Sequence, residues 1–154
     1  MAEKEQHIDF DKLRGGYYTP SPIAEFICSW AIQNEDDLVL EPSCGDGNFI
    51  QAAIERFGEL GVNGNKLYGR LRGIELIPEE AVKAANRAAN FGLNNDTIVN
   101  DDFFSFISRQ ENATYNSIIG NPPFIRYQNF PAEHRDIAIK MMEDIGLKPN
   151  KLTN

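Results

Sequence analysis

Four short apolar segments, each followed by a polar turn and then by a helical pattern, constrain the fold of this chain more than any other feature. These segments are predicted strands, at residues 38–40, 71–75, 97–100 and 115–119. No hairpin turn joins two of them directly, because stretches with helical spacing of apolar residues separate them. Strands that alternate with helices form βαβ units. We therefore expect an α/β fold with a parallel sheet and helices on both faces.

The helices are predicted from start signals and apolar spacing. Ser21 followed by Pro22 has the pattern of an N-cap and a first helical residue. The helix that follows is expected to bury one stripe of side chains, made of Ile23, Phe26, Ile27, Trp30 and Ala31. The other predicted helices lie around residues 49–57, 78–91, 103–107 and 132–145.

Length and charge restrict the class of protein. With 154 residues and 42% hydrophobic content the chain can bury one core, so we expect one domain or one large piece of one, preceded by a polar segment at 1–15. A formal charge of -8 argues against a free-standing nucleic-acid clamp, because phosphate contacts are made by clustered Lys and Arg.

The cysteines and the hydropathy exclude further classes. Cys28 and Cys44 lack the spacing of a disulfide framework or a zinc site, so we expect reduced packing residues and no metal. The charged start has no apolar leader, and no apolar run has the length that spans a bilayer. A cytoplasmic protein without a membrane partner is the expectation.

Each predicted strand ends in a polar signal. In open parallel sheets a ligand crevice lies beyond the carboxyl ends of the strands, where the strand order reverses. The signals at these ends are Glu41, Glu75, Asp101 with Asp102, and Asn121. Each acid taken alone is as readily an ordinary solvated loop residue, but their recurrence at successive strand ends predicts one shared pocket.

The turn after the first predicted strand, residues 42–47, favours a ligand with positive charge. Gly45 and Gly47 remove side-chain bulk and permit positive φ, so a ligand can approach the backbone. The turn resembles half of a dinucleotide fingerprint, but Ile50 stands where the third glycine would be. Because the surroundings are acidic and the fingerprint is incomplete, a cation suits this turn better than a pyrophosphate does.

The most specific signal is the sequence Asn121-Pro122-Pro123-Phe124. Two consecutive prolines remove two backbone donors and fix φ, so the Pro122 carbonyl can face a ligand instead of entering a helix. With the Asn121 side-chain oxygen it presents two acceptors to an exocyclic amino group. Phe124 offers a flat face on which a base can stack. The alternative is a rigid turn with Phe124 in the core.

These motifs, in this order, resemble the gamma-type DNA adenine N6-methyltransferases of restriction-modification systems. The resemblance runs from about Gly16 to the last predicted helix and implies a Rossmann-like fold that binds S-adenosylmethionine. Residues 16–154 would be the amino-terminal part of the catalytic domain.

The resemblance also implies roles for single residues. Thr19, within Tyr18-Thr19-Pro20, would contact the methionine carboxylate of the cofactor. Glu41 and the turn with Pro42, Ser43, Gly45 and Gly47 would embrace its methionine part, and Glu75 its ribose. Asp102, with Asp101 left open as the alternative, would bind its adenine beside Leu76 and Phe103. Residues 121–124 would receive the target base, with Asn121 also near the cofactor.

The chain departs from the family in its extent, because the family has further strands and a target-recognition region after the Asn-Pro-Pro-Phe motif. We therefore expect a part of the full enzyme, inactive when isolated, that meets DNA through the complete protein and can self-associate through the edge of the fourth strand. Three alternatives stay open: a protein glutamine methyltransferase, an RNA adenine or N4-cytosine enzyme, and a half-domain that binds S-adenosylmethionine without catalysis.

Overall fold

The computed structural model describes residues 18–110, 114–123 and 132–149, which form parts of two compact units. The first, here called the sheet unit, comprises Tyr18–Phe103 and Gln110–Pro122. The second is described at 104–109, at Pro123 and at 132–149, and it contains the helix α6 (Ala132–Asp144), as predicted. The predicted polar segment at 1–15 and the side chain of Phe124 lie outside the described residues.

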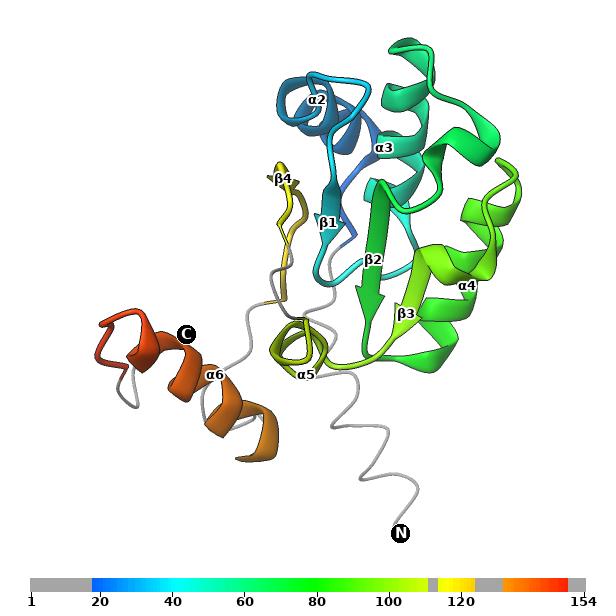
Figure 1. Cartoon of the computed structure of the whole chain (residues 1–154). Coiled ribbons are helices and arrows are strands. Elements are labelled where there is room, and N and C mark those ends of the chain that lie inside the picture. The colour runs from blue at the N-terminus through cyan, green and yellow to red at the C-terminus, as the bar shows by residue number, and fades with distance from the viewer. Residues whose placement is uncertain (1–17, 111–113, 124–131, 150–154) are drawn as a thin grey trace, which may run out of the picture. The chain divides into compact units, whose positions relative to one another are not determined.

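The sheet unit is built on four parallel strands in the order β3-β2-β1-β4 (Figure 1). Their bounds are β1 Val39–Glu41, β2 Leu71–Glu75, β3 Ile98–Asn100 and β4 Ser117–Ile118. Val39 pairs with Leu71 on one side and with Ser117 on the other. The order runs outward from β1 in both directions, so the switch point lies between β1 and β4. All four predicted strands are confirmed, with ends shifted by up to two residues.

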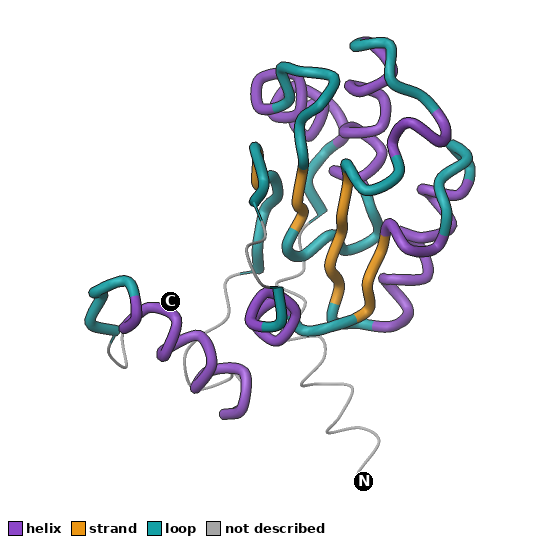
Figure 2. The backbone as a smooth tube through the Cα atoms, viewed as in Figure 1, coloured by secondary structure: helices purple, strands orange, loops and turns teal. Residues whose placement is uncertain are grey.

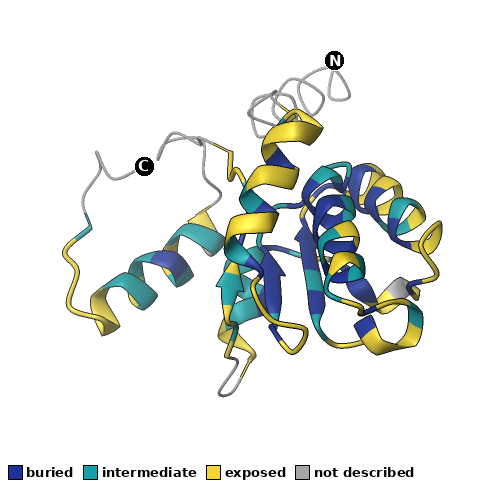
Figure 3. Ribbon diagram, turned by 90° about the horizontal axis from the view of Figure 1, so that it is seen from above, coloured by how far each residue is buried: buried dark blue, intermediate teal, exposed yellow. Residues whose placement is uncertain are grey.

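Three α-helices line one face of this sheet: α2 (Ser21–Ala31), α3 (Asn48–Glu59) and α4 (Pro78–Ala89). The crossovers β1-α3-β2 and β2-α4-β3 advance in the same direction, and because such crossovers are right-handed both helices lie on one face. α2 packs against α3, and α3 against α4. Figure 2 shows the alternation of strands and helices, and Figure 3 shows the helices beside the buried strands. Helices on the second face stay a prediction.

Short elements complete the described chain. One-turn 3-10 helices, η1 (Gly64–Leu67) and η2 (Asn95–Thr97), precede β2 and β3. The short helix α5 (Phe103–Ser108) follows β3, as predicted. None of the described helices is long and apolar enough to cross a membrane.

The core lies between the sheet and the helix layer. The strands contribute apolar side chains that point toward the helices, and the helices contribute side chains that are small on α2 and α4 and large on α3. The members at the centre are Val39, Leu71, Ile98, Ala24, Cys28, Ile50, Phe57, Ala84 and Ala88. Cys28 and Cys44 are both free and buried, which confirms the prediction of packing cysteines.

The face that α2 buries differs from the prediction. Ile23, Phe26 and Trp30 are exposed, Trp30 at 76%, whereas Ala24 and Cys28 are fully buried. Two stripes overlap along this helix, and the one with small residues faces α3 because it lets the two backbones approach closely. The predicted stripe is therefore wrong for three of its members. Ser21 is also not the N-cap: it is the first helical residue, and Pro20 precedes it without a capping side chain.

β4 pairs with β1 alone among the strands that the structure describes. Ile118 on this strand is exposed. The predicted self-association through this edge stays a prediction, since one chain gives no observation of a second copy.

Gly47 illustrates how tightly the turn after β1 packs on α4. Its φ is 90°, and a Cβ at this position would lie 2.9 Å from the Ala84 Cα. Gly61 has almost the same φ, 85°, with nothing within 4 Å of its Cβ position. A comparison of the two glycines therefore separates the cost of placing a side chain at positive φ from the cost of its clash with Ala84.

We predict that Gly47→Ala lowers the free energy of unfolding by about 1–3 kcal/mol more than Gly61→Ala does, because only Gly47 meets backbone atoms. Urea denaturation followed by circular dichroism measures both variants. Equal losses would show that the contact with Ala84 relaxes without cost.

Candidate functional site

The carboxyl ends of β1, β2 and β3 are joined by backbone hydrogen bonds. The Cys44 N–H donates to the Ile74 carbonyl at 2.9 Å, which places the turn 42–47 against the end of β2. The Asp101 N–H donates to the Glu75 carbonyl at 3.0 Å, which places the residues after β3 there too. The predicted convergence of strand ends is thus observed within the sheet unit.

The Glu75 carboxylate fastens the turn to β2. Its Oε2 accepts the Gly45 N–H at 2.8 Å and its Oε1 accepts the Ile77 N–H at 2.7 Å, in a side chain that is only 8% exposed. The sequence predicted that Glu75 binds a ligand, but it did not predict this structural role. A carboxylate oxygen accepts more than one hydrogen bond, so capacity for a hydroxyl group remains.

Glu41 is the most buried acid of the site, at 1% exposure. Its Oε1 accepts the Ser43 N–H at 3.2 Å, whereas its buried Oε2 and the buried Ser43 hydroxyl have no hydrogen-bond partner in the described structure. Such unsatisfied groups are rare because they cost free energy. The two groups, one at the end of β1 and one on the turn that follows, are those that would gain hydrogen bonds from a polar ligand.

The end of β4 lies directly on this carboxylate. A Cβ on Gly120 would come within 2.2 Å of the Glu41 Oε1, and the φ of Gly120 is 149°, so only glycine suits this position. Asn121 is the next residue. The fourth strand end therefore lies at the Glu41 carboxylate, at the same end of the parallel sheet as the other three.

Burial changes the acid–base properties of the site. Desolvation raises the pKa of Glu41 to about 8, the Ser43 N–H opposes this shift, and the charge of Glu75 adds to it. Desolvation, reinforced by Glu41, also raises the pKa of the Cys28 thiol to about 12 and that of Cys44 further. A cation beside Glu41 would favour its ionised form.

The acids after β3 differ in their surroundings. Asp102 is buried at 7% exposure, and its N–H donates to the Asp101 Oδ1 at 2.9 Å. Asp101 is thereby engaged in the local turn. Phe103 is half-buried, and Leu76, after β2, is exposed.

The segment 18–20 lies beside the turn. The Tyr18 hydroxyl donates to the Glu80 Oε2 at 3.1 Å, and its ring carbon Cε1 is 3.6 Å from where a Cβ on Gly45 would be. The Thr19 carbonyl accepts the Asn48 Nδ2 at 2.9 Å, and Pro20 is exposed. Asn48 was not predicted as part of the site.

The motif after β4 is open to solvent. Asn121, Pro122 and Pro123 are exposed, while Pro42 in the first turn is half-buried. Phe124 lies outside the described residues. The described site thus combines buried acids with an exposed pair of acceptor-bearing residues.

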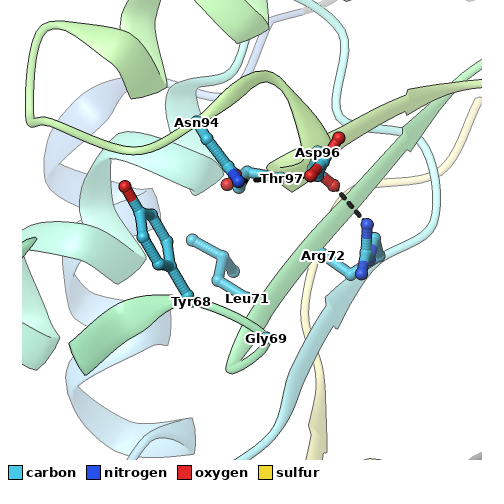
Figure 4. A pocket seen from close by; sticks show the side chains of 7 residues that line it. All are labelled: Tyr68, Gly69, Leu71, Arg72, Asn94, Asp96 and Thr97. Carbon is cyan, nitrogen blue, oxygen red and sulfur yellow. Dashed lines mark hydrogen bonds between the residues drawn. The ribbon is translucent and has the colours of Figure 1, made fainter. Parts of the chain in front are cut away.

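A cavity of about 200 Å³ lies at the opposite ends of the strands (Figure 4). Its lining residues are Tyr68, Gly69, Leu71, Arg72, Asn94, Asp96 and Thr97. They precede or begin β2 and β3, so this cavity is at the amino ends of the strands, away from the candidate site. Within the described residues, no group of three His, Cys, Asp or Glu side chains could hold a metal ion.

A parallel sheet with this strand order and with acidic side chains at its carboxyl edge defines a Rossmann-like α/β domain. Residues 8–153 match the model of the family described as N-6 DNA methylase, and the chain belongs to this family.

Individual relatives agree with the family. Type II methyltransferase M.XamI of Xanthomonas campestris pv. amaranthicola is 26% identical over 140 residues, which are 90% of this chain and 25% of the relative. Type II methyltransferase M.CvrRI of Paramecium bursaria Chlorella virus XZ-6E is 30% identical over 137 residues, 87% of this chain and 30% of the relative. The chain therefore spans about a quarter of the length of these relatives.

Among solved structures, the M protein of the Type I restriction enzyme EcoKI is similar with a TM-score of 0.62. The identity is 18%, and the match covers 71% of this chain and 26% of that chain. This likeness confirms the predicted fold.

Glu41 should make stability depend on pH. Its pKa is about 8 in the folded chain against an ordinary value of 4.5, so the folded state holds a proton that the unfolded state releases between these values. The resulting stability is fully present below pH 4.5 and is lost as the pH rises toward 8.

We predict that the free energy of unfolding of Glu41→Gln rises relative to that of the parent chain as the pH rises from 4.5 to 8, by roughly 1 kcal/mol per pH unit. Differential scanning fluorimetry across this range measures the difference in Tm. Glu25→Gln, an exposed acid on α2, is the control and should show no such slope. A pH-independent difference for Glu41→Gln would contradict the protonated state.

Proposed function

We propose that this chain forms the cofactor-binding and base-receiving part of an S-adenosylmethionine-dependent DNA adenine N6-methyltransferase of restriction-modification type. The observation that supports the proposal most is the buried acid Glu41 against Gly120, the residue before Asn121, in a chain of the N-6 DNA methylase family. The names of M.XamI and M.CvrRI as Type II methyltransferases support it.

The cofactor is proposed to occupy the carboxyl edge of the sheet unit. Its sulfonium and ammonium charges suit a site whose acids are Glu41, Glu75 and Asp102, all buried. The unpartnered Glu41 Oε2 and Ser43 hydroxyl are the groups that a polar ligand would satisfy. Glu75 would accept the ribose hydroxyls with its remaining lone pairs.

The ends of the cofactor are assigned by neighbouring segments. Asp102 would accept the adenine amino group, with Leu76 and Phe103 against the ring. Thr19 would contact the methionine carboxylate, with the turn glycines Gly45 and Gly47 allowing close approach to the backbone. These roles follow the family resemblance. The contacts of Glu75 with Gly45 and of Thr19 with Asn48 support them for the methionine and ribose parts.

The target amine is proposed to bind at Asn121. An adenine N6 lone pair is delocalised into the ring, so the amine must be held in its pyramidal form to attack. Hydrogen bonds from the amine to the Asn121 oxygen and the Pro122 carbonyl strengthen as positive charge develops on nitrogen, which stabilises the transition state selectively. The cofactor would supply the methyl group and leave as the neutral thioether, and the methylated amine would then release one proton to solvent, so no dedicated general base is needed.

DNA is proposed as the partner because of the family and its relatives. The base must leave the duplex to reach this site, with Phe124 as its stacking surface. A chain with net charge -8 makes few phosphate contacts of its own. Calorimetric titration with S-adenosylmethionine tests cofactor binding by this chain, and absence of binding would refute the proposed site.

We predict that Asn121→Ala lowers the single-turnover rate of methyl transfer about 100-fold while cofactor affinity stays within a few-fold. Transfer of a labelled methyl group to adenine-containing duplex DNA is followed with the full-length gene product. Asn86→Ala, at an exposed position of α4, is the matched control. Unaltered turnover in the Asn121 variant would remove it from the reaction.

We predict that Asp102→Asn raises the Kd for S-adenosylmethionine about tenfold, because an adenine amino group would lose its charged acceptor. Asp101→Asn is the matched comparison, since the Asp101 carboxylate already accepts the Asp102 N–H. Calorimetry on both variants decides between the two acids. A larger loss in the Asp101 variant would reverse the assignment.

A further inference from the structure

Arg87, in the last turn of α4, donates to three side chains of the neighbouring segment. Its Nη2 donates to the Asp46 Oδ2 at 2.9 Å. Its Nη1 donates to the Asn48 Oδ1 at 2.7 Å and to the Gln51 Oε1 at 3.1 Å. One guanidinium therefore joins α4 to the glycine turn and to the start of α3.

Asn48 extends this connection to the segment 18–20. Its Nδ2 donates to the Thr19 carbonyl at 2.9 Å while its Oδ1 accepts from Arg87. Because the two ends of the amide have opposite hydrogen-bonding roles, both partners together fix its orientation. Arg87, Asn48 and Thr19 thus form one chain of hydrogen bonds.

The same face of α4 makes two further contacts with these segments. Glu80 accepts the Tyr18 hydroxyl at 3.1 Å, and Ala84 packs under Gly47. Glu80, Ala84 and Arg87 are spaced four and three residues apart, so they share one side of the helix. α4 therefore supports both the turn 42–47 and the segment 18–20.

An ordinary surface ion pair would have little effect here, since exposed pairs contribute little. The pair of Arg87 with Asp46 differs because both side chains are mostly buried, at 29% and 24% exposure, and because the guanidinium fork binds acceptors in two directions at once. A lysine at this position would be a point charge and could not hold Asp46 and Asn48 in the same geometry.

We propose that Arg87 is a positioning residue that sets the geometry of the turn 42–47 and of Thr19, and through them the affinity for the cofactor. The inference rests on the proposed function, since it concerns the same site. Arg87 acts through Asp46 and Asn48, to which it donates hydrogen bonds. A misplacement of about 1 Å in such a support is sufficient for losses of 10²-fold in an enzyme.

The test compares Arg87→Met and Arg87→Lys with Arg56→Met. Arg56, on α3, is the matched control: it is 20% exposed and donates to the Ile32 carbonyl and to Glu59, away from the site. Calorimetry with S-adenosylmethionine measures Kd for each full chain. Both Arg87 variants should bind at least about tenfold more weakly than the parent, whereas Arg56→Met should keep the parent affinity.

Two further readouts distinguish positioning from general stability. Without ligand, amide hydrogen exchange at residues 44–48 and at Thr19 should be faster in Arg87→Met than in the parent chain. The amides of β2, Leu71–Glu75, are the control and should exchange at the parent rate. In calorimetry, the double variant Arg87→Met with Asn48→Ala should bind no more weakly than the weaker single variant, because both changes break one connection.

The outcomes separate the two proposals. No binding of S-adenosylmethionine by the parent chain would overturn the proposed function and the role of Arg87 with it. Binding by the parent with unchanged affinity in Arg87→Met, or an equal loss in Arg56→Met, would overturn the role of Arg87 alone. Unchanged hydrogen exchange at residues 44–48 would overturn it as well.

Discussion

The bridge from the Glu75 carboxylate to the amides of Gly45 and Ile77 is the interaction on which the site depends. The parallel register brings the strand ends to one edge, but it leaves the turn 42–47 free to take several paths. With both oxygens engaged, Glu75 selects the path in which the Gly45 amide faces β2. A buried carboxylate can do this because hydrogen bonds to backbone amides compensate its desolvation.

Glu41 has the opposite character. One oxygen of the Glu41 carboxyl group has no hydrogen-bond partner in the described structure, and Glu75 is a second acid nearby. Gly120 lies so close to this group that a side chain at position 120 would clash with it. The raised pKa of Glu41 reports that the ionised form is unfavourable in this structure. A carboxyl group kept in this state gains most from a cationic neighbour, since the attraction also restores the charge that burial disfavours. The proposed cofactor has such charges, so binding and ionisation of Glu41 would be coupled.

The sequence predicted the fold to different degrees in different places. β2 was predicted with its observed bounds, because the glycine-rich polar stretch at 58–65 and the helix start at Pro78 leave only a short segment between them for a strand. The buried face of α2 was not, because Ile23, Phe26 and Trp30 repeat with the same period as Ala24 and Cys28, and periodicity alone does not say which stripe meets α3. The strand ends meet at one end of the sheet as predicted, and the single pocket that they would surround stays a prediction. Asn48 and Arg87 were missed. Their partners are 29 to 41 residues away, a separation at which no local pattern exists.

The difference in exposure within the site agrees with how the two reactants of the proposed reaction would reach it. Glu41, Glu75 and Asp102 are buried, whereas Asn121 and Pro122 are exposed. Groups that hold a small diffusible cofactor benefit from a low dielectric, in which charge interactions are strong. Groups that receive a base from a duplex must be reachable from the surface, because the rest of the nucleic acid stays outside. Gly120 connects the two regions, because it lies against the Glu41 carboxylate and precedes Asn121 in the chain. The proposed site of the methyl donor and the proposed site of the acceptor amine therefore lie next to each other at the end of β4.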